Sequence, residues 1–228
     1  MIDAVLLDWE GALFDSADMR RESLLRALAA EGMPVDPIAY HTLCDGRTVP
    51  EAAANMLAHT GRRDPVVVEL VTLRAQRAFT ERLGKGFVLL PGAREFVRRI
   101  QARTRVAIVT NASRVETDFV LRLSGLDDAI STIVTADDVA FPPPAPDVYL
   151  RAVKQLDRVR TVHPDRIIAV ASTPQALRAA HAAALKAVAV NSQAHVALDG
   201  DGAADGVDGL GLTELARLAN IHLREQQA

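Results

Sequence analysis

The sequence of 228 residues contains one cysteine, Cys44. A single thiol forms neither a disulfide framework nor a thiolate metal site, which excludes those two classes of protein. Every apolar run is shorter than the ~18 residues that span a membrane. The first ten residues, MIDAVLLDWE, carry acids at three positions and do not resemble a secretion signal. We therefore expect a cytoplasmic protein that makes no use of a membrane.

A strong charge of one sign is also lacking, because the formal net charge is −3. Without a basic excess or a basic stripe, a nucleic-acid partner is not expected. The glycine pattern of dinucleotide-binding enzymes is missing as well, since the first apolar run ends in Trp9-Glu10-Gly11-Ala12. Hydrophobic residues make up 49% of the chain, enough for one large domain or for a core domain that carries a smaller insertion.

Short β-branched runs alternate with helical patterns over most of the chain. Strands are predicted at residues 4–7, 105–110, 131–135, 166–171 and 187–190, with a last short strand at 196–198. Helices are predicted at 93–102, 114–124, 146–156, 174–185 and 212–223, and the glycine-rich stretch 200–211 is predicted to be a loop or a strand-to-helix connection. This order predicts an α/β fold with a doubly wound parallel sheet.

The segment after the first strand contains only helical patterns. A first helix ends at Gly32, and others are predicted at residues 36–43, 49–59 and 65–83; Thr48 and Glu51 form a capping box at the start of the third. We therefore expect a core domain at residues 1–15 and 87–228 with an all-helical cap domain at 16–86. Its apolar helices could also pair two copies of the chain.

In such sheets the reactive crevice lies beyond the carboxyl ends of the strands. Asp8 and Glu10 follow the first strand as either a nucleophile with a proton carrier or two acids in a solvated turn. Thr110 and Asn111 follow the second strand and form either an anion site or an ordinary approach to a helix capped by Ser113. Arg47 in the insertion is either an anion ligand or a solvated side chain.

Four segments in order resemble the motifs of the haloacid dehalogenase-like (HAD) superfamily, in the phosphatase and β-phosphoglucomutase-like branch with a helical (C1-type) cap. They are LLDWEGALFDS, VAIVTNASR, DDVAFPPPAPDVYLRAV and IIAVASTPQALRAAHAAALKAVAV. The resemblance covers nearly the whole chain and implies a HAD-like Rossmannoid core. It also implies a hydrolase that acts on a small-molecule phosphate ester or another small anion.

The resemblance assigns a role to each matching residue. Asp8 matches the nucleophile, and Glu10 stands where the family has the aspartate that acts as general acid/base. Thr110 and Asn111 match the phosphate-binding residues. Arg47 matches no family motif, and we expect it to act as the substrate-specificity residue of the cap. If Mg²⁺ binds, the resemblance implies that it contacts Asp8 and the backbone carbonyl of Glu10.

Several charged residues of the family pattern are replaced. Pro143 stands in place of the lysine and has neither a charge nor an N–H. Ala171 and Ser172 stand in place of the two acids that complete the Mg²⁺ site. Compensation could come from the acids Asp137, Asp138 and Asp147 or from the cations Arg47 and Arg114.

The sequence therefore predicts a degenerate active site and a weak or lost phosphohydrolase activity, with a role as a ligand-binding protein or pseudo-phosphatase. Two alternatives remain at this point. One is a competent Mg²⁺-dependent phosphomonoesterase with compensating residues, and the other is a metal-free hydrolase of the dehalogenase type that uses Asp8.

Overall fold

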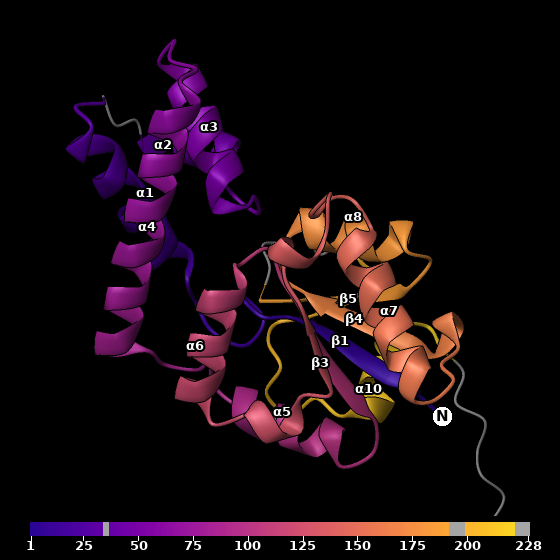
Figure 1. The fold of residues 1–228 in the computed structure, drawn as a ribbon. Coiled ribbons are helices and arrows are strands. Elements are labelled where there is room, and N and C mark those ends of the chain that lie inside the picture. Colours follow the sequence, from indigo (N-terminus) through magenta and orange to yellow (C-terminus); the bar gives the residue numbers. More distant parts are fainter. Residues whose placement is uncertain (34–36, 192–198, 222–228) are drawn as a thin grey trace, which may run out of the picture.

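A computed structural model describes residues 1–33, 37–191 and 199–221. Its centre is a parallel sheet of six strands in the order β3-β2-β1-β4-β5-β6 (Figure 1). The strands are β1 (Ala4–Asp8), β2 (Arg105–Val109), β3 (Thr132–Val134), β4 (Ile167–Ala171), β5 (Lys186–Val190) and β6 (Gly202–Ala204). The predicted α/β fold with a parallel sheet is confirmed, and β1 lies between β2 and β4.

The glycine-rich stretch departs from its prediction as a loop or connection. Residues Gly202–Ala204 form β6, which pairs in parallel with β5. A Gly-Ala-Ala segment has almost no side chain to produce a strand pattern, so its pairing depends on the neighbouring strand. The strand predicted at residues 196–198 lies outside the described residues.

In the described part of the chain the helices that cover the sheet are α5 (Ala93–Gln101), α6 (Arg114–Ser124), α7 (Asp147–Val159), α8 (Pro174–Ala182) and α10 (Leu212–Leu218). Side chains from α5, α6 and α10 share one apolar cluster with Val5 and Leu7 of β1. Side chains from α7 and α8 share the cluster on the other face with Ala4 and Leu6. Successive residues of β1 thus point to opposite faces, as in a sheet buried on both sides.

Helix α8 ends at Ala182, three residues before its predicted end. Ala184 follows in a left-handed conformation with φ of 59°, which an α-helix does not allow. A sequence of alanines gives no sign of this change, because alanine favours the helix at every position.

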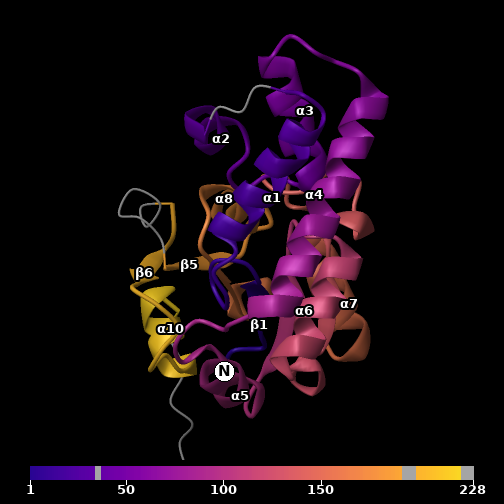
Figure 2. The ribbon, with the colours of Figure 1, turned by 90° about the vertical axis from the view of Figure 1, so that its left-hand side faces the viewer.

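The cap consists of α1 (Ala17–Ala30), α2 (Pro37–Leu43), α3 (Val49–His59) and α4 (Pro65–Gly86). Figure 2 shows these helices gathered above the sheet. They bury an apolar cluster of their own, centred on Leu28, Met56 and Leu57. The capping box of Thr48 and Glu51 is present at the start of α3.

Two chain crossings connect the cap to the core, and they lie side by side. Phe14 forms a β-bridge with Leu89, and the Leu90 amide donates a hydrogen bond to the Leu13 carbonyl at 2.9 Å. The Phe14 ring contacts the rings of Trp9 and Phe87, with centroids 5.9 and 5.4 Å apart. The crossings therefore form one packed unit beneath the cap.

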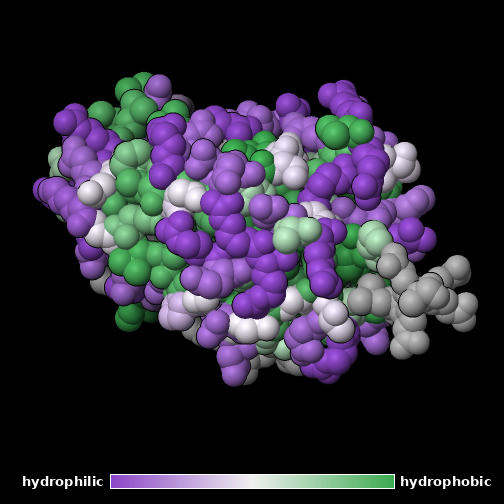
Figure 3. Space-filling view, turned by 90° about the horizontal axis from the view of Figure 1, so that it is seen from below, coloured by the Kyte–Doolittle hydropathy of each residue, from purple (hydrophilic) through white to green (hydrophobic). Residues whose placement is uncertain are grey.

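Among the described residues no helix is both long enough and apolar enough to cross a membrane. On the face seen from below, hydrophilic side chains are interspersed with smaller hydrophobic areas (Figure 3).

Candidate active site

A cleft of about 870 Å³ lies between the cap and the carboxyl ends of the central strands. Asp8 is the last residue of β1, Thr110 follows β2 and Ser172 follows β4. All three line the cleft because neighbouring parallel strands end at the same edge of the sheet. The cap contributes a second wall that includes Arg20, Tyr40 and Arg47.

The Asp8 side chain is nearly buried, with 9% of the residue exposed. Burial raises the pKa of the Asp8 carboxyl well above its ordinary value, and the neighbouring charge of Glu10 raises it further. A hydrogen bond from the backbone of Trp9 acts in the opposite direction. Burial raises the pKa of the Tyr149 hydroxyl, and the charge of Asp8 raises it further.

The Glu10 carboxylate does not point freely into the cleft. It accepts hydrogen bonds from the Ser16 hydroxyl at 2.9 Å and from Arg20 Nε at 3.0 and 3.1 Å, and it forms an ion pair with Arg20 Nη2. Arg20 Nη1 also donates to Glu116 at 2.8 Å. One guanidinium thus bridges an acid of the β1 turn and an acid of helix α6.

Arg20 is a site residue that the sequence analysis missed. Its side chain is only 14% exposed and lies over the Phe79 ring, 3.6 Å from the centroid. Although burial works against its charge, the carboxylates of Glu10 and Glu116 raise its pKa above the ordinary value. Its position four residues before Leu24, on the buried side of α1, was the available signal.

Thr110 and Asn111 lie at the cleft as predicted, but both make contacts within the chain. The Thr110 hydroxyl accepts a hydrogen bond from the Ala112 amide at 3.1 Å. Asn111 Nδ2 donates to the carbonyl of Gly46 in the cap at 2.7 Å. Asn111 therefore joins the cap to the core. Ser113 caps α6 in a capping box with Glu116, as one of the two sequence interpretations held.

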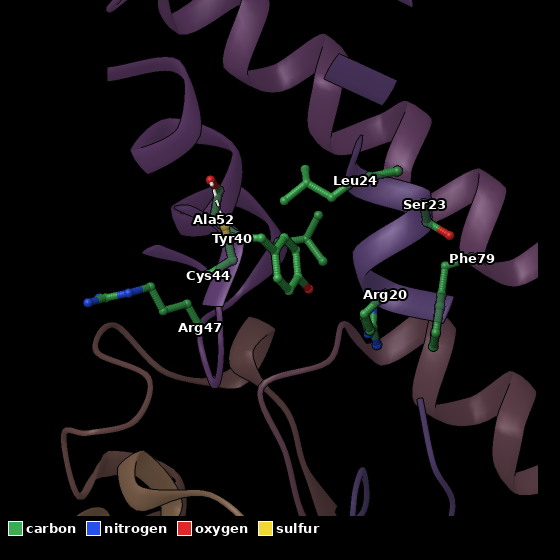
Figure 4. A pocket seen from close by; sticks show the side chains of 10 residues that line it. Arg20, Ser23, Leu24, Tyr40, Cys44, Arg47, Ala52 and Phe79 are labelled. Carbon is green, nitrogen blue, oxygen red and sulfur yellow. Dashed lines mark hydrogen bonds between the residues drawn. The ribbon is translucent and has the colours of Figure 1, made fainter. Parts of the chain in front are cut away.

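Arg47 follows Gly46 and lines the cleft. Figure 4 shows its side chain extending away from the group formed by Tyr40, Arg20 and Phe79. Within the described part of the chain it forms no ion pair, so its charge is available to a ligand.

Apart from Arg47, the residues that could have replaced the missing charges pair with one another or lie outside the cleft. Arg114 donates to Asp138 at 2.6 Å, and its amide donates to Asp137 at 2.7 Å. Neither these three residues nor Asp147 is among those that line the cleft. Pro143 does line it, and so brings an uncharged ring to the position of the family lysine.

Ser172 makes a contact that the sequence did not reveal. Its hydroxyl donates to the backbone carbonyl of Glu10 at 3.2 Å. This is the carbonyl that the family resemblance assigned to Mg²⁺. The residues present do not fit such an ion, because a neutral serine occupies the carbonyl and the Glu10 carboxylate is turned to Arg20.

A family model described as haloacid dehalogenase-like hydrolase matches residues 2–184. The protein belongs to this family of hydrolases, and the match agrees with the parallel sheet and the cap.

Among its relatives is the protein CbbY of Rhodobacter capsulatus, 29% identical over 84% of this chain and 86% of that protein. Another is a chloroplastic 5-amino-6-(5-phospho-D-ribitylamino)uracil phosphatase of Arabidopsis thaliana, 29% identical over 96% of this chain. The chain spans 58% of the length of that phosphatase. The crystal structure of CbbY from Rhodobacter sphaeroides in complex with phosphate superposes with a TM-score of 0.83 at 26% identity, covering 94% of this chain and 99% of the other. These comparisons place the chain among HAD-like proteins of the phosphatase branch.

Proposed function

We propose that the cleft binds a small phosphate ester and that the chain hydrolyses it weakly or not at all. The ligand class is supported by the relatives, which include a phosphatase and a structure that holds phosphate. In this proposal Asp8 faces the phosphorus, Thr110 and Asn111 lie beside the phosphate group, and Arg47 contacts the remainder of the ligand.

The observation that carries the loss of activity is the network around Glu10. A general acid must release its proton to the leaving group and take it back during the reaction. The Glu10 carboxylate already accepts from Ser16 and Arg20, and its partly buried ion pair with Arg20 must be broken before it can move a proton. Glu10 is therefore proposed to be a structural partner of Arg20 that does not transfer protons efficiently.

The lack of positive charge around Asp8 also predicts a low activity. Phosphoryl transfer depends on positive groups that are in place before the charge develops, and each is worth about 3 kcal/mol. Pro143 contributes none, and the Arg20 charge is shared between two carboxylates. A bound phosphate ester would thus lack the stabilisation that its transition state requires.

The test is phosphate release from a panel of small phosphate esters, combined with calorimetric binding of the same esters. We expect measurable binding with turnover far below the ordinary range of ~1–10³ s⁻¹. Turnover within that range that disappears in Asp8→Asn would contradict the proposal. Absence of binding across the panel would contradict its ligand class.

A gain-of-function variant sharpens the test. It combines Glu10→Asp, Pro143→Lys, Ala171→Glu and Ser172→Asp, which restores the charged groups of the family pattern. We expect Mg²⁺-dependent phosphate release to appear, and to vanish when Asp8→Asn is added as the control. If the combined variant folds and stays inactive, missing charge alone does not explain the low activity.

A further inference from the structure

At the floor of the cleft, where β1 and β4 end, the Ser172 side chain packs against the turn that follows β1. The Ser172 hydroxyl donates to the Glu10 carbonyl at 3.2 Å. Gly11, the next residue, has φ of +76°, and a Cβ there would lie 2.1 Å from the same hydroxyl oxygen. The serine therefore packs directly against the backbone of this turn, and the Glu10 carbonyl already has a hydrogen-bond donor.

The acids around this point do not form a set that a divalent cation prefers. Mg²⁺ takes hard oxygen ligands in a near-octahedral arrangement, usually one or two carboxylates together with waters and substrate phosphates. In the parts of the chain that the structure describes, no three His, Cys, Asp or Glu residues gather in a way that could hold a metal ion. At the tips of β1 and β4 the carboxyl is that of Asp8, since Ala171 ends β4 and Ser172 follows it, both without charge.

A positive charge is nevertheless present, and a side chain supplies it. The Arg20 guanidinium is anchored between Glu10 and Glu116 and is held over the Phe79 ring. An arginine remains charged at every working pH, so this cation cannot dissociate as a metal ion would. Ser172 thus donates to the carbonyl that an ion would contact, and Arg20 neutralises the acid of the same turn, Glu10.

We infer that the cleft binds its ligand without a divalent cation, because Ser172 donates to the Glu10 carbonyl and Arg20 holds the Glu10 carboxylate. The inference takes from the proposed function only that the ligand is a phosphate compound. If it is correct, the affinity for phosphate does not depend on Mg²⁺.

The first experiment measures calorimetric binding of inorganic phosphate to the full chain, in EDTA and again in millimolar Mg²⁺. Coupled sites ordinarily change one another's affinity by about 5–150-fold. We expect the phosphate affinity to change by less than about twofold, below that range. An affinity that rises in Mg²⁺ by a factor within the range overturns the inference and leaves the proposed ligand class intact.

The second experiment uses Mg²⁺ alone and follows Tm, so it needs no bound phosphate. Ser172→Asp places a carboxylate beside the Glu10 carbonyl, and Ser172→Ala is its control because it removes the hydroxyl without adding a charge. We expect a saturable rise of Tm in Ser172→Asp and no such rise in the wild type or in Ser172→Ala, because only a protein that binds the ion is stabilised by it.

A saturable rise in the wild type overturns the inference. A folded Ser172→Asp that fails to respond overturns the assignment of this position to the ion. If phosphate binds in neither buffer, the proposed function fails, whereas the Mg²⁺ titration of the wild type still decides the question of the metal.

Discussion

At the scale of single residues, Arg20 links two acids of the core to the cap. It joins the turn after β1 to helix α6, although its partner Glu116 lies 96 positions away in the sequence. Its side chain lies beside the small cavity of the cap that Ser23 and Tyr40 also line (Figure 4). A buried cation between two acids is well compensated only while all three charges are present.

Replacement of Arg20 by methionine tests this. Arg20→Met keeps an apolar side chain over Phe79 but leaves Glu10 and Glu116 without their partner. We expect the free energy of unfolding to fall by about 3–5 kcal/mol, as for other broken buried pairs. Urea denaturation measures the change.

Arg26→Met on the same helix is the matched control for this variant. Arg26 is exposed and forms no ion pair in the described part of the chain, so its replacement should change stability by less than about 0.5 kcal/mol. Adding Glu10→Gln and Glu116→Gln to Arg20→Met should recover part of the loss. Equal effects of the Arg20 and Arg26 replacements would show that the buried charges are not coupled.

The sequence could predict the positions of site residues that follow strands. Asp8, Thr110, Asn111 and Ser172 each stand at the end of an apolar run, and the geometry of a parallel sheet brings such ends together. It could not predict their partners. The contacts of Ser172 with the Glu10 carbonyl and of Asn111 with Gly46 join segments that a local pattern does not relate.

At the scale of elements, two helices of equal length begin with the same capping box. Helix α3 starts with Thr48 and Glu51, and α6 starts with Ser113 and Glu116. Both boxes could be predicted from the sequence, since the motif is local. They differ in one respect, because Glu116 is also bonded to Arg20 and Glu51 is not.

This pair of helices allows a matched comparison. Thr48→Ala should reduce the free energy of unfolding by about 1 kcal/mol, the usual value of a lost N-cap. Ser113→Ala should reduce it by at least as much, because the Ser113 hydroxyl donates at 3.1 Å to Glu116, and Glu116 also holds Arg20. Thermal and urea denaturation of both variants provide the measurement. A smaller loss for Ser113→Ala would mean that α6 and the Arg20 network are independent.

At the scale of the whole molecule, the cap is fastened to the core at the far side of the cleft as well as at the two crossings. Asn111 donates to the Gly46 carbonyl at 2.7 Å, and Gln175 Nε2 donates to the Asp45 carbonyl at 2.9 Å. Together with the Arg20 bridge, these contacts hold the cap to the core through the chain's own groups. Asp45 and Gly46, whose carbonyls accept these bonds, are followed by Arg47. The Arg47 amide donates to the Cys44 carbonyl at 3.1 Å.

Gly46→Ala is expected to weaken the contacts that hold the cap to the core. Gly46 has φ of +69°, and an added Cβ would lie 2.5 Å from the Gln175 amide oxygen, so the glutamine must move and release Asp45. Gly32→Ala is the matched control in the cap, with φ of +67° and no atom within 4 Å of the added Cβ. Both variants carry the strain of a left-handed alanine, about 1–2 kcal/mol, but Gly46→Ala should lose about 1 kcal/mol more for the displaced hydrogen bond. Hydrogen exchange should then accelerate at the Arg47 amide in Gly46→Ala and stay unchanged there in Gly32→Ala. Equal stability losses with equal exchange would mean that the loop contacts do not hold the cap, whose attachment would then depend on the crossings and on Arg20.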